Sequence, residues 1–277
     1  MTHPIYSIFV AKLLVWVHST DSNLDLPSWV PDWSRYPITT FMGAPSPVTS
    51  PASVILQAPA DQAQKYRSTE ISILPKHSLR LSRKLCDEIS VLGNKHIDLR
   101  KDQKPRVIYD DFADWYAETS ILVSHANPTY PTGIPWQEVY IRTLTMETVG
   151  LGDRSASQAP SNAHLQLSHA RIRQWNRGSR IDKFIAGDEN DETIFWHDAL
   201  KISEKCFFLT TKGYVDLAPS GTQIGDRIDT LLGIKNPFIV HKVEGGYRLI
   251  GPCYVQGMME GEAVLSDHVP FEPITLV

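Results

Sequence analysis

The last third of the chain alternates short β-type runs with turns that carry glycine. The runs are rich in Phe, Tyr, Val, Ile and Leu, which suit a pleated, half-buried surface. Glycine suits the turns because it adopts a positive φ at little cost. The five runs are Phe207–Thr211, Tyr214–Leu217, Arg227–Leu232, Phe238–Val240 and Tyr247–Val255. This pattern predicts a small C-terminal β-barrel or sandwich of short antiparallel strands.

The preceding two-thirds of the chain favours helices. Between residues 107 and 125 apolar side chains recur at helical spacing, and between 136 and 146 they do so again. The first of these helices would turn its acidic residues to solvent. Residues 6–17 and a more polar region over 164–201 also favour helix. The faces expected to turn inward carry Ile108, Phe112, Trp115, Thr119 and Leu122, then Val139, Tyr140 and Leu144.

One segment of this region fits either helix or strand. Its leucines and isoleucines between Ile71 and Leu92 match both spacings, and we favour two short strands with a break at Arg83-Lys84. The fold class is therefore predicted to be α+β, mostly helical in the N-terminal two-thirds with a few strands. We expect residues 1–203 to form a helical or mixed region with a junction helix and a Pro-rich loop at 43–63. Residues 204–277 would pack on it.

Composition excludes several classes of protein. The formal net charge is −4 and no Lys/Arg run is present, so nucleic-acid binding is not expected. The apolar stretch Ile5–Val17 is shorter than the roughly 20 residues of a transmembrane helix, and Lys12 interrupts it. Three distant cysteines, Cys86, Cys206 and Cys253, suggest free buried thiols. We expect a cytoplasmic protein without a membrane span.

No catalytic motif is apparent in the sequence. A phosphate-binding P-loop, a dinucleotide fingerprint and a G-x-S-x-G elbow are all missing. His164 and His169 are five residues apart, which does not suit one helical face, so no metal site is expected and no cofactor is implied. Asp226, Arg227 and Tyr254 are the candidate polar groups of a binding site. The simpler interpretation of Gly225-Asp226 is a hairpin turn in which Asp226 caps backbone N–H groups.

The segment Leu26–Ser34 (LPSWVPDWS) combines two prolines with two tryptophans. Proline excludes helix, and tryptophan buries a large apolar area. The segment therefore predicts an extended strap laid across a core and held by Trp29 and Trp33. A ligand cage formed by the two indoles is the alternative.

These segments together resemble fungal heterokaryon-incompatibility (HET) proteins. The resemblance is carried by LPSWVPDWS, by the YPTG turn at Tyr130–Gly133 with Arg142-Thr143-Leu144 after it, and by two C-terminal blocks. The blocks are FLTTKGYVDLAPSGTQIGDRIDTLLG from Phe208 and GPCYVQGMMEGE at Gly251–Glu262. The residues that match the family's motifs are Trp29, Pro31, Asp32, Trp33, Tyr130, Gly133, Arg142, Gly213, Gly225, Asp226, Gly257 and Glu262.

The matched portion resembles the region that follows the HET domain in these proteins, and the hallmarks of the HET domain itself are not found. The resemblance implies a recognition or regulatory module of an allorecognition protein associated with programmed cell death. Such a module would be non-enzymatic, lack the effector domain and bind a protein partner. Asp216 stands where the family usually has Gly, which affects local turn geometry only.

Two alternatives remain beside this module. One is an enzyme of unassigned chemistry in a fungal secondary-metabolite pathway, with Asp226, Arg227 and Tyr254 lining a pocket. The other is a structural role in which the helix Tyr6–Val17 packs on a HET domain, a contact that Leu13→Asp would weaken.

Overall fold

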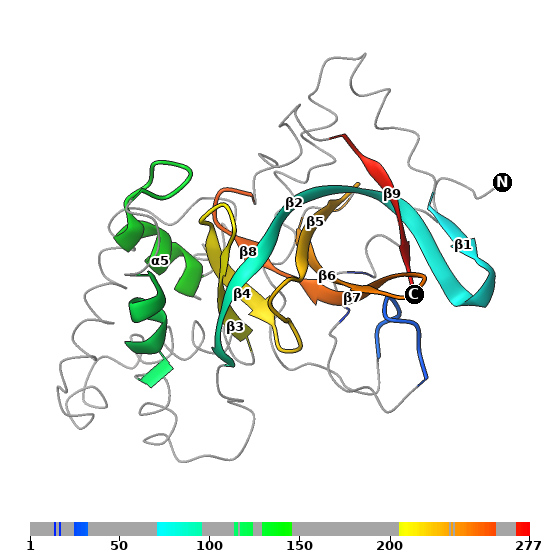
Figure 1. The fold of residues 1–277 in the computed structure, drawn as a ribbon, viewed down its shortest axis with the longest axis horizontal. Helices are drawn as coiled ribbons and strands as arrows, with labels where there is room; N and C mark the ends of the chain where they lie inside the picture. Colours follow the sequence, from blue (N-terminus) through cyan, green and yellow to red (C-terminus); the bar gives the residue numbers. More distant parts are fainter. Residues whose placement is uncertain are drawn as a thin grey trace, which may run out of the picture.

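The computed structural model describes residues 14, 17, 25–32, 71–95, 114–115, 117–123, 129–145, 205–232, 234, 236–258 and 270–277. Strands account for 50% of the interpretable residues and helices for 16%. The prediction of a mostly helical N-terminal two-thirds is therefore wrong. Figure 1 shows β-strands curving through the centre of the molecule, with the helical segments on one side.

Five strands form a closed ring. They are β2 (Ser78–Lys95), β5 (Arg227–Leu231), β6 (Pro237–Val243), β7 (Gly246–Pro252) and β9 (Glu272–Leu276). Consecutive strands from β5 to β7 are antiparallel, and β7 joins β9 through a single parallel pair, Tyr247 and Leu276. Strand β2 pairs with β9 over Leu79–Arg83 and with β5 over Arg83–Glu88, so the ring closes through β2.

Strand β2 continues beyond the ring into a second sheet. There it pairs with β3 (Lys205–Thr210), which pairs with β4 (Val215–Pro219), and β4 pairs with β8 (Tyr254–Val255). The register of β2 shifts at three places, between Leu85 and Asp87 and twice more after Ile89. Such bulges bend a strand and increase its twist, which allows one 18-residue strand to serve both sheets.

The segment 71–95 forms two strands, as predicted, but the break between them lies at a different position. The short strand β1 (Ser72–Leu74) pairs with the start of β2, and a 3-10 turn, η1 (Pro75–His77), separates them. No break occurs at Arg83-Lys84, because Arg83 is buried in an ion pair with Asp229 and the strand runs through it. A strand that begins at residue 78 also places part of the β-structure far upstream of the predicted C-terminal β-region. The predicted domain boundary at residue 203 stays a prediction. Strand β2 pairs with β1 before this boundary and with β3, β5 and β9 after it.

Apolar side chains form three layers across the two sheets. The first fills the ring, where Leu79, Leu81 and Leu231 meet Phe238 and Ile274. The second lies between the ring and the second sheet, and the third covers the far face of the second sheet. The second layer contains Ile89, Phe208, Ala218, Ile228, Ile239, Ile250 and Val255, and the third contains Trp115, Tyr130, Val139, Tyr140, Phe207, Val215, Leu217 and Tyr254.

Helix α5 (Trp136–Thr145) supplies part of the third layer, beside helical residues at 114–115 and 117–123. Val139, Tyr140 and Trp115 are buried there, as their spacing predicts. Glu118 lies on the expected acidic face but accepts hydrogen bonds from Asn94 of β2, at 2.9 Å from the backbone N and 2.8 Å from Nδ2. The predicted helices at 6–17 and 164–201, and the Pro-rich loop, fall largely or wholly outside the described residues. Leu14 and Val17 are described, and both are buried in the first layer.

Candidate functional site

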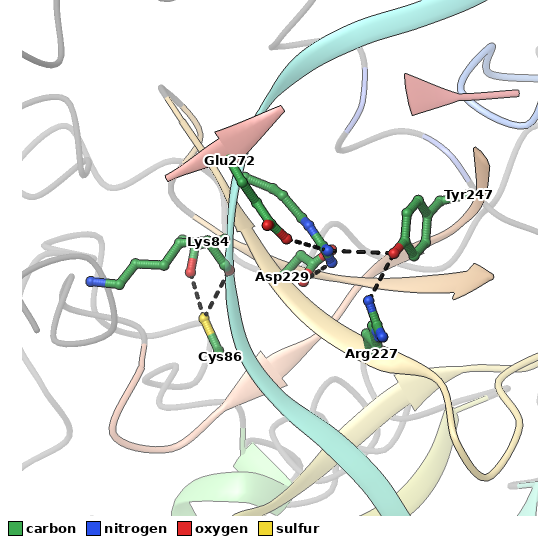
Figure 2. A network of polar contacts seen from close by, with 8 residues as sticks. Lys84, Cys86, Arg227, Asp229, Tyr247 and Glu272 are labelled. Carbon is green, nitrogen blue, oxygen red and sulfur yellow. Dashed lines mark hydrogen bonds and ion pairs between the residues drawn. The ribbon is translucent and has the colours of Figure 1, made fainter. Parts of the chain in front are cut away.

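A cluster of charged and phenolic side chains lies inside the strand ring. It consists of Arg83 from β2, Arg227 and Asp229 from β5, Tyr247 from β7 and Glu272 from β9, and we call it the polar cluster. Alternate residues of a strand share one face. On β2, Arg83 therefore points into the ring together with Leu79 and Leu81. On β5, Arg227 and Asp229 point into it together with Leu231. Figure 2 shows Asp229, Tyr247 and Glu272 converging from three different strands.

Arg83 is the centre of the polar cluster. Its Nη1 donates to both carboxylate oxygens of Asp229, at 3.0 and 2.7 Å. Its Nη2 donates to Oε1 of Glu272 at 2.5 Å and lies 3.4 Å from the hydroxyl of Tyr247. Arg227 donates to the same hydroxyl at 2.7 Å. Both guanidinium groups also stand over the Tyr247 ring, with Cζ at 4.8 and 5.7 Å from the ring centre. Figure 2 marks the hydrogen bonds and ion pairs with dashed lines.

The buried pair at the centre has perturbed titration. Burial raises the pKa of Asp229 to about 6, because the charged form loses hydration, and the Arg83 guanidinium only partly opposes this. For Arg83, burial lowers the pKa, but the contacts with Asp229, Tyr247 and Glu272 together outweigh that effect and leave the pKa above its ordinary value. In this ion pair Arg83 is therefore the group whose charged form is favoured, whereas burial favours the neutral form of Asp229.

Cys86 lies behind the polar cluster, on the other face of β2 and β5. Its Sγ is 2.8 Å from Oγ1 of Thr230 and 3.5 Å from the backbone carbonyl of Lys84. Burial raises the pKa of the Cys86 thiol, so the thiolate needed for nucleophilic chemistry is disfavoured. All three cysteines are free and buried, as the sequence predicts.

The structure separates the three polar groups predicted for a binding site. Asp226 and Arg227 are consecutive residues, and consecutive side chains at a strand point to opposite faces. Asp226 is buried and accepts from the backbone N–H of Gln223 at 2.8 Å, with its other oxygen 2.5 Å from Nδ1 of His241. Arg227 joins the polar cluster. Tyr254 is in the third layer and donates to Oε1 of Gln256 at 2.8 Å.

Three turns that carry family-motif residues meet at the edge of the third layer. The hydroxyl of Tyr130 in the YPTG turn donates to the carbonyl of Gln256 at 2.6 Å, and its ring meets that of Tyr214 edge-on. Gly257, at φ +90°, lies so close to Thr132 that an added Cβ would stand 2.5 Å from its methyl group. Gly213, at φ +88°, faces Pro131. These turns are therefore joined by packing, although they are distant in sequence.

The other motif residues have structural roles where they are described. Arg142 donates to Glu138 one helical turn earlier, at 2.7 Å. Trp29 donates from Nε1 to the carbonyl of His77 at 2.8 Å and packs on the ring core, as predicted for the strap, but the segment is not extended, since Val30 donates to the carbonyl of Pro27 in a turn. Pro31 is buried and Asp32 half-buried beside it. Gly225, at φ +88°, donates its N–H to Ile89 at 2.9 Å in the turn before β5. Trp33 and Glu262 lie outside the described residues, so the indole cage stays untested.

Ser28 of the strap bridges the weakest junction of the ring. The backbone N–H of Ser28 donates to the carbonyl of Val277 at 3.1 Å, and its hydroxyl also donates to that carbonyl. The same hydroxyl accepts from the N–H of Leu249 on β7 at 3.0 Å. The strap thereby ties β7 to the end of β9, which otherwise share one parallel pair.

Sequence reasoning missed most of the polar cluster. Arg83 was expected at a strand break, and Asp229, Tyr247 and Glu272 were not singled out. One signal was present: charged residues within otherwise apolar β-type runs, such as Asp229 in RIDTLL, must be paired if they are buried. The sequence does not indicate which residues pair with them, since Arg83 and Asp229 are 146 residues apart.

Residues 176–269 match the Het-6 beta-barrel domain. The match supports a HET-related family, in agreement with the resemblance seen in the sequence. It spans β3 to β8, whereas β2 and β9 of the ring lie outside it. No curated protein and no solved structure matches the chain.

Two further properties concern the described part of the chain alone. Within it, no group of three or more His, Cys, Asp or Glu side chains is arranged to hold a metal ion. None of its helices has the length and hydropathy needed to span a bilayer.

Proposed function

We propose that this chain is a recognition or regulatory module of a HET-type allorecognition protein, acting in fungal heterokaryon incompatibility without chemistry of its own. The observation that carries the proposal is the match of residues 176–269 to the Het-6 beta-barrel domain. The closed strand ring supports it, because the matched strands form most of that ring. A protein partner is the expected ligand.

The partners of the candidate polar groups favour a module over an enzyme. Asp226 holds a turn through Gln223 and pairs with His241, while Tyr254 holds Gln256 in the third layer. Catalysis requires acid, base and nucleophile to converge on one substrate position. Here the three predicted groups face different surroundings, so they do not form such a set.

The turn before β5 offers a contact for a protein partner. Ile224 at its tip is 65% exposed. The turn is fixed on both sides: Gly225 donates to Ile89, Ile89 donates to Asp226, and Asp226 pairs with His241. A fixed apolar tip loses little conformational freedom when it enters a pocket, which favours its use in recognition. We propose Ile224 as a contact residue of the module.

A deletion and two matched substitutions test this proposal. Deleting the gene should convert at least one incompatible pair of strains into a compatible one, measured as survival of fused cells. Restoring the gene with Ile224→Asp should leave the pair compatible. Ile73→Asp should restore incompatibility, because Ile73 is 63% exposed on β1, far from that turn in sequence.

The outcomes separate the role from the contact residue. If deletion changes no pair in a panel of incompatible strains, the proposed function is wrong. If deletion has an effect and Ile224→Asp restores incompatibility as well as Ile73→Asp does, the module stands but Ile224 is not its contact.

A further inference from the structure

Two cations, Arg227 of the polar cluster and Lys242 of the neighbouring strand β6, have no carboxylate within ion-pair distance in the described part of the chain. Arg83 uses both carboxylates of the cluster, Asp229 and Glu272. In the described part of the chain, neither Arg227 nor Lys242 forms an ion pair; the hydroxyl of Tyr247 is the side-chain acceptor of Arg227. Cations normally approach carboxylates or solvent, so these two remain available to an added anion.

Strand register places these cations on one face. Arg227 of β5 stands opposite Val240 of β6, and Lys242 is two residues further along β6. Side chains two residues apart in a strand share a face, and diagonal neighbours lie roughly 7–8 Å apart. Lys242 stands opposite Tyr247 of β7. Three adjacent strands therefore present a guanidinium, an ammonium and a phenol side by side.

Hydrogen-bond donors outnumber acceptors at this position. The Tyr247 hydroxyl accepts from Arg83 and Arg227, which leaves its own hydrogen to donate. Arg227 has five N–H donors, one of which goes to Tyr247. Lys242 adds three more and is exposed, while Arg227 and Tyr247 are half-buried, so all three can be reached from solvent. Figure 2 shows Arg227 and Tyr247 facing each other at the edge of the cluster.

From this arrangement we infer a binding site for the phosphate group of a small molecule, formed by Arg227, Lys242 and Tyr247. A phosphomonoester carries a charge of about −1.5 to −2 at neutral pH, which matches two cations. Its oxygens point in several directions and can accept from three strands at once. A carboxylate is planar and is satisfied by one guanidinium, as Arg83 and Asp229 demonstrate.

Two carboxylates oppose an anion at this site: Asp229, which shares a face of β5 with Arg227 and interacts with it electrostatically but is already paired with Arg83, and the exposed Glu88, which provides the sharper test. Glu88 of β2 stands opposite Arg227 on its other side and is exposed. It forms no ion pair with Arg227 in the described structure, but its charge repels an anion there. Replacing Glu88 by Gln should therefore strengthen phosphate binding. This inference is independent of the proposed incompatibility role.

The experiment titrates the full ¹⁵N-labelled chain with inorganic phosphate at constant ionic strength and follows by NMR the arginine Nε–Hε signals and the backbone amides of residues 227, 242 and 247, which report on every variant. The Arg227 signal should shift and saturate. Arg227→Gln and Lys242→Gln should each weaken phosphate affinity about tenfold, the effect of losing a charge-assisted hydrogen bond. Tyr247→Phe should weaken it less, and Glu88→Gln should strengthen it. Acetate should bind more weakly than phosphate.

Arg248→Gln is the matched control. Arg248 is the next residue of β7, is exposed, points to the opposite face and carries the same charge. Its loss should leave phosphate binding unchanged. The site is refuted by an unsaturable titration, by equal losses in Arg248→Gln and Arg227→Gln, or by a Glu88→Gln chain that binds no better. Acetate binding as tight as phosphate would refute the assignment of ligand class. Thermal unfolding of each variant excludes loss of the fold.

Discussion

The ring interior and the third layer both bury polar side chains, but they do so with different chemistry. In the ring, Arg83 joins two carboxylates that lie 146 and 189 residues away in sequence. In the third layer, the hydroxyl groups of Tyr130, Tyr140 and Tyr254 form hydrogen bonds with neutral partners. A buried ion without its counter-ion is far more costly than a buried hydroxyl without its acceptor. The ring therefore depends on pairing, and the third layer on close packing.

The largest effect is expected from removing the central carboxylate of the ring. Asp229→Ala should lower the free energy of unfolding by about 3–5 kcal/mol, since Arg83 stays buried with only Glu272 as a counter-ion. Urea denaturation measures the change. The double substitution Arg83→Met with Asp229→Leu is the control and should recover much of the loss. If Asp229→Ala lowered the free energy of unfolding by less than the removal of one buried hydroxyl group does, the ring interior and the third layer would not differ as described.

The ring should also respond to pH, because burial raises the pKa of Asp229 to about 6. Between pH 3.8 and about 6, Asp229 is protonated in the folded chain but ionised in the unfolded chain, where its pKa is 3.8. The contribution of Asp229 to the free energy of unfolding should therefore be largest below pH 4 and should fall as the pH rises to about 6. The slope should reach about 1.4 kcal/mol per pH unit.

The comparison for this slope is Asp229→Asn, which cannot titrate at this position. Subtracting its unfolding free energies from those of the unaltered chain isolates the contribution of Asp229. A difference that is flat with pH, or that rises between pH 4 and 6, would show that the Arg83 ion pair outweighs burial.

In the third layer the sensitive feature is close packing between turns. Gly257→Ala should lower stability by about 1–3 kcal/mol, because φ is +90° and the new methyl group would stand 2.5 Å from Thr132. Thr132→Ser with Gly257→Ala removes the clashing methyl group and should recover part of the loss. Gly133→Ala, with φ +77° but open space around it, separates backbone strain from the clash.

The smallest effect is expected at the strap. Ser28→Ala should cost about 0.5–1.5 kcal/mol, since it removes one neutral hydrogen-bond bridge between Leu249 and Val277. Amide exchange of Leu249 should accelerate, while exchange of Val240 in the adjacent strand should not. Equal acceleration at both amides would mean that the strap supports the whole ring and not only the junction of β7 and β9.

The sequence by itself determined strands β3 to β8, their turns and the buried helical side chains around Trp115 and Val139, whereas β9 was not predicted. Its local signals were strong there: short β-type runs, glycines such as Gly213 and Gly245 at positive φ, and helical spacing around Trp115 and Val139. It also indicated that the segment around Trp29 packs on the core, because tryptophan buries a large apolar area, but the predicted extended conformation is wrong, since the chain turns between Pro27 and Val30.

Only the tertiary structure decided how these pieces combine. Arg83 and Lys84 suggest a strand break locally, yet β2 runs through them because Asp229 and Glu272 arrive from distant strands to pair with Arg83. The long-range pairing of β2 with β5 and β9 also made β2 part of the ring. The register of the consecutive strands β5, β6 and β7 set Arg227, Lys242 and Tyr247 on one face. Register between strands is a non-local property, since it is fixed by which faces become buried together.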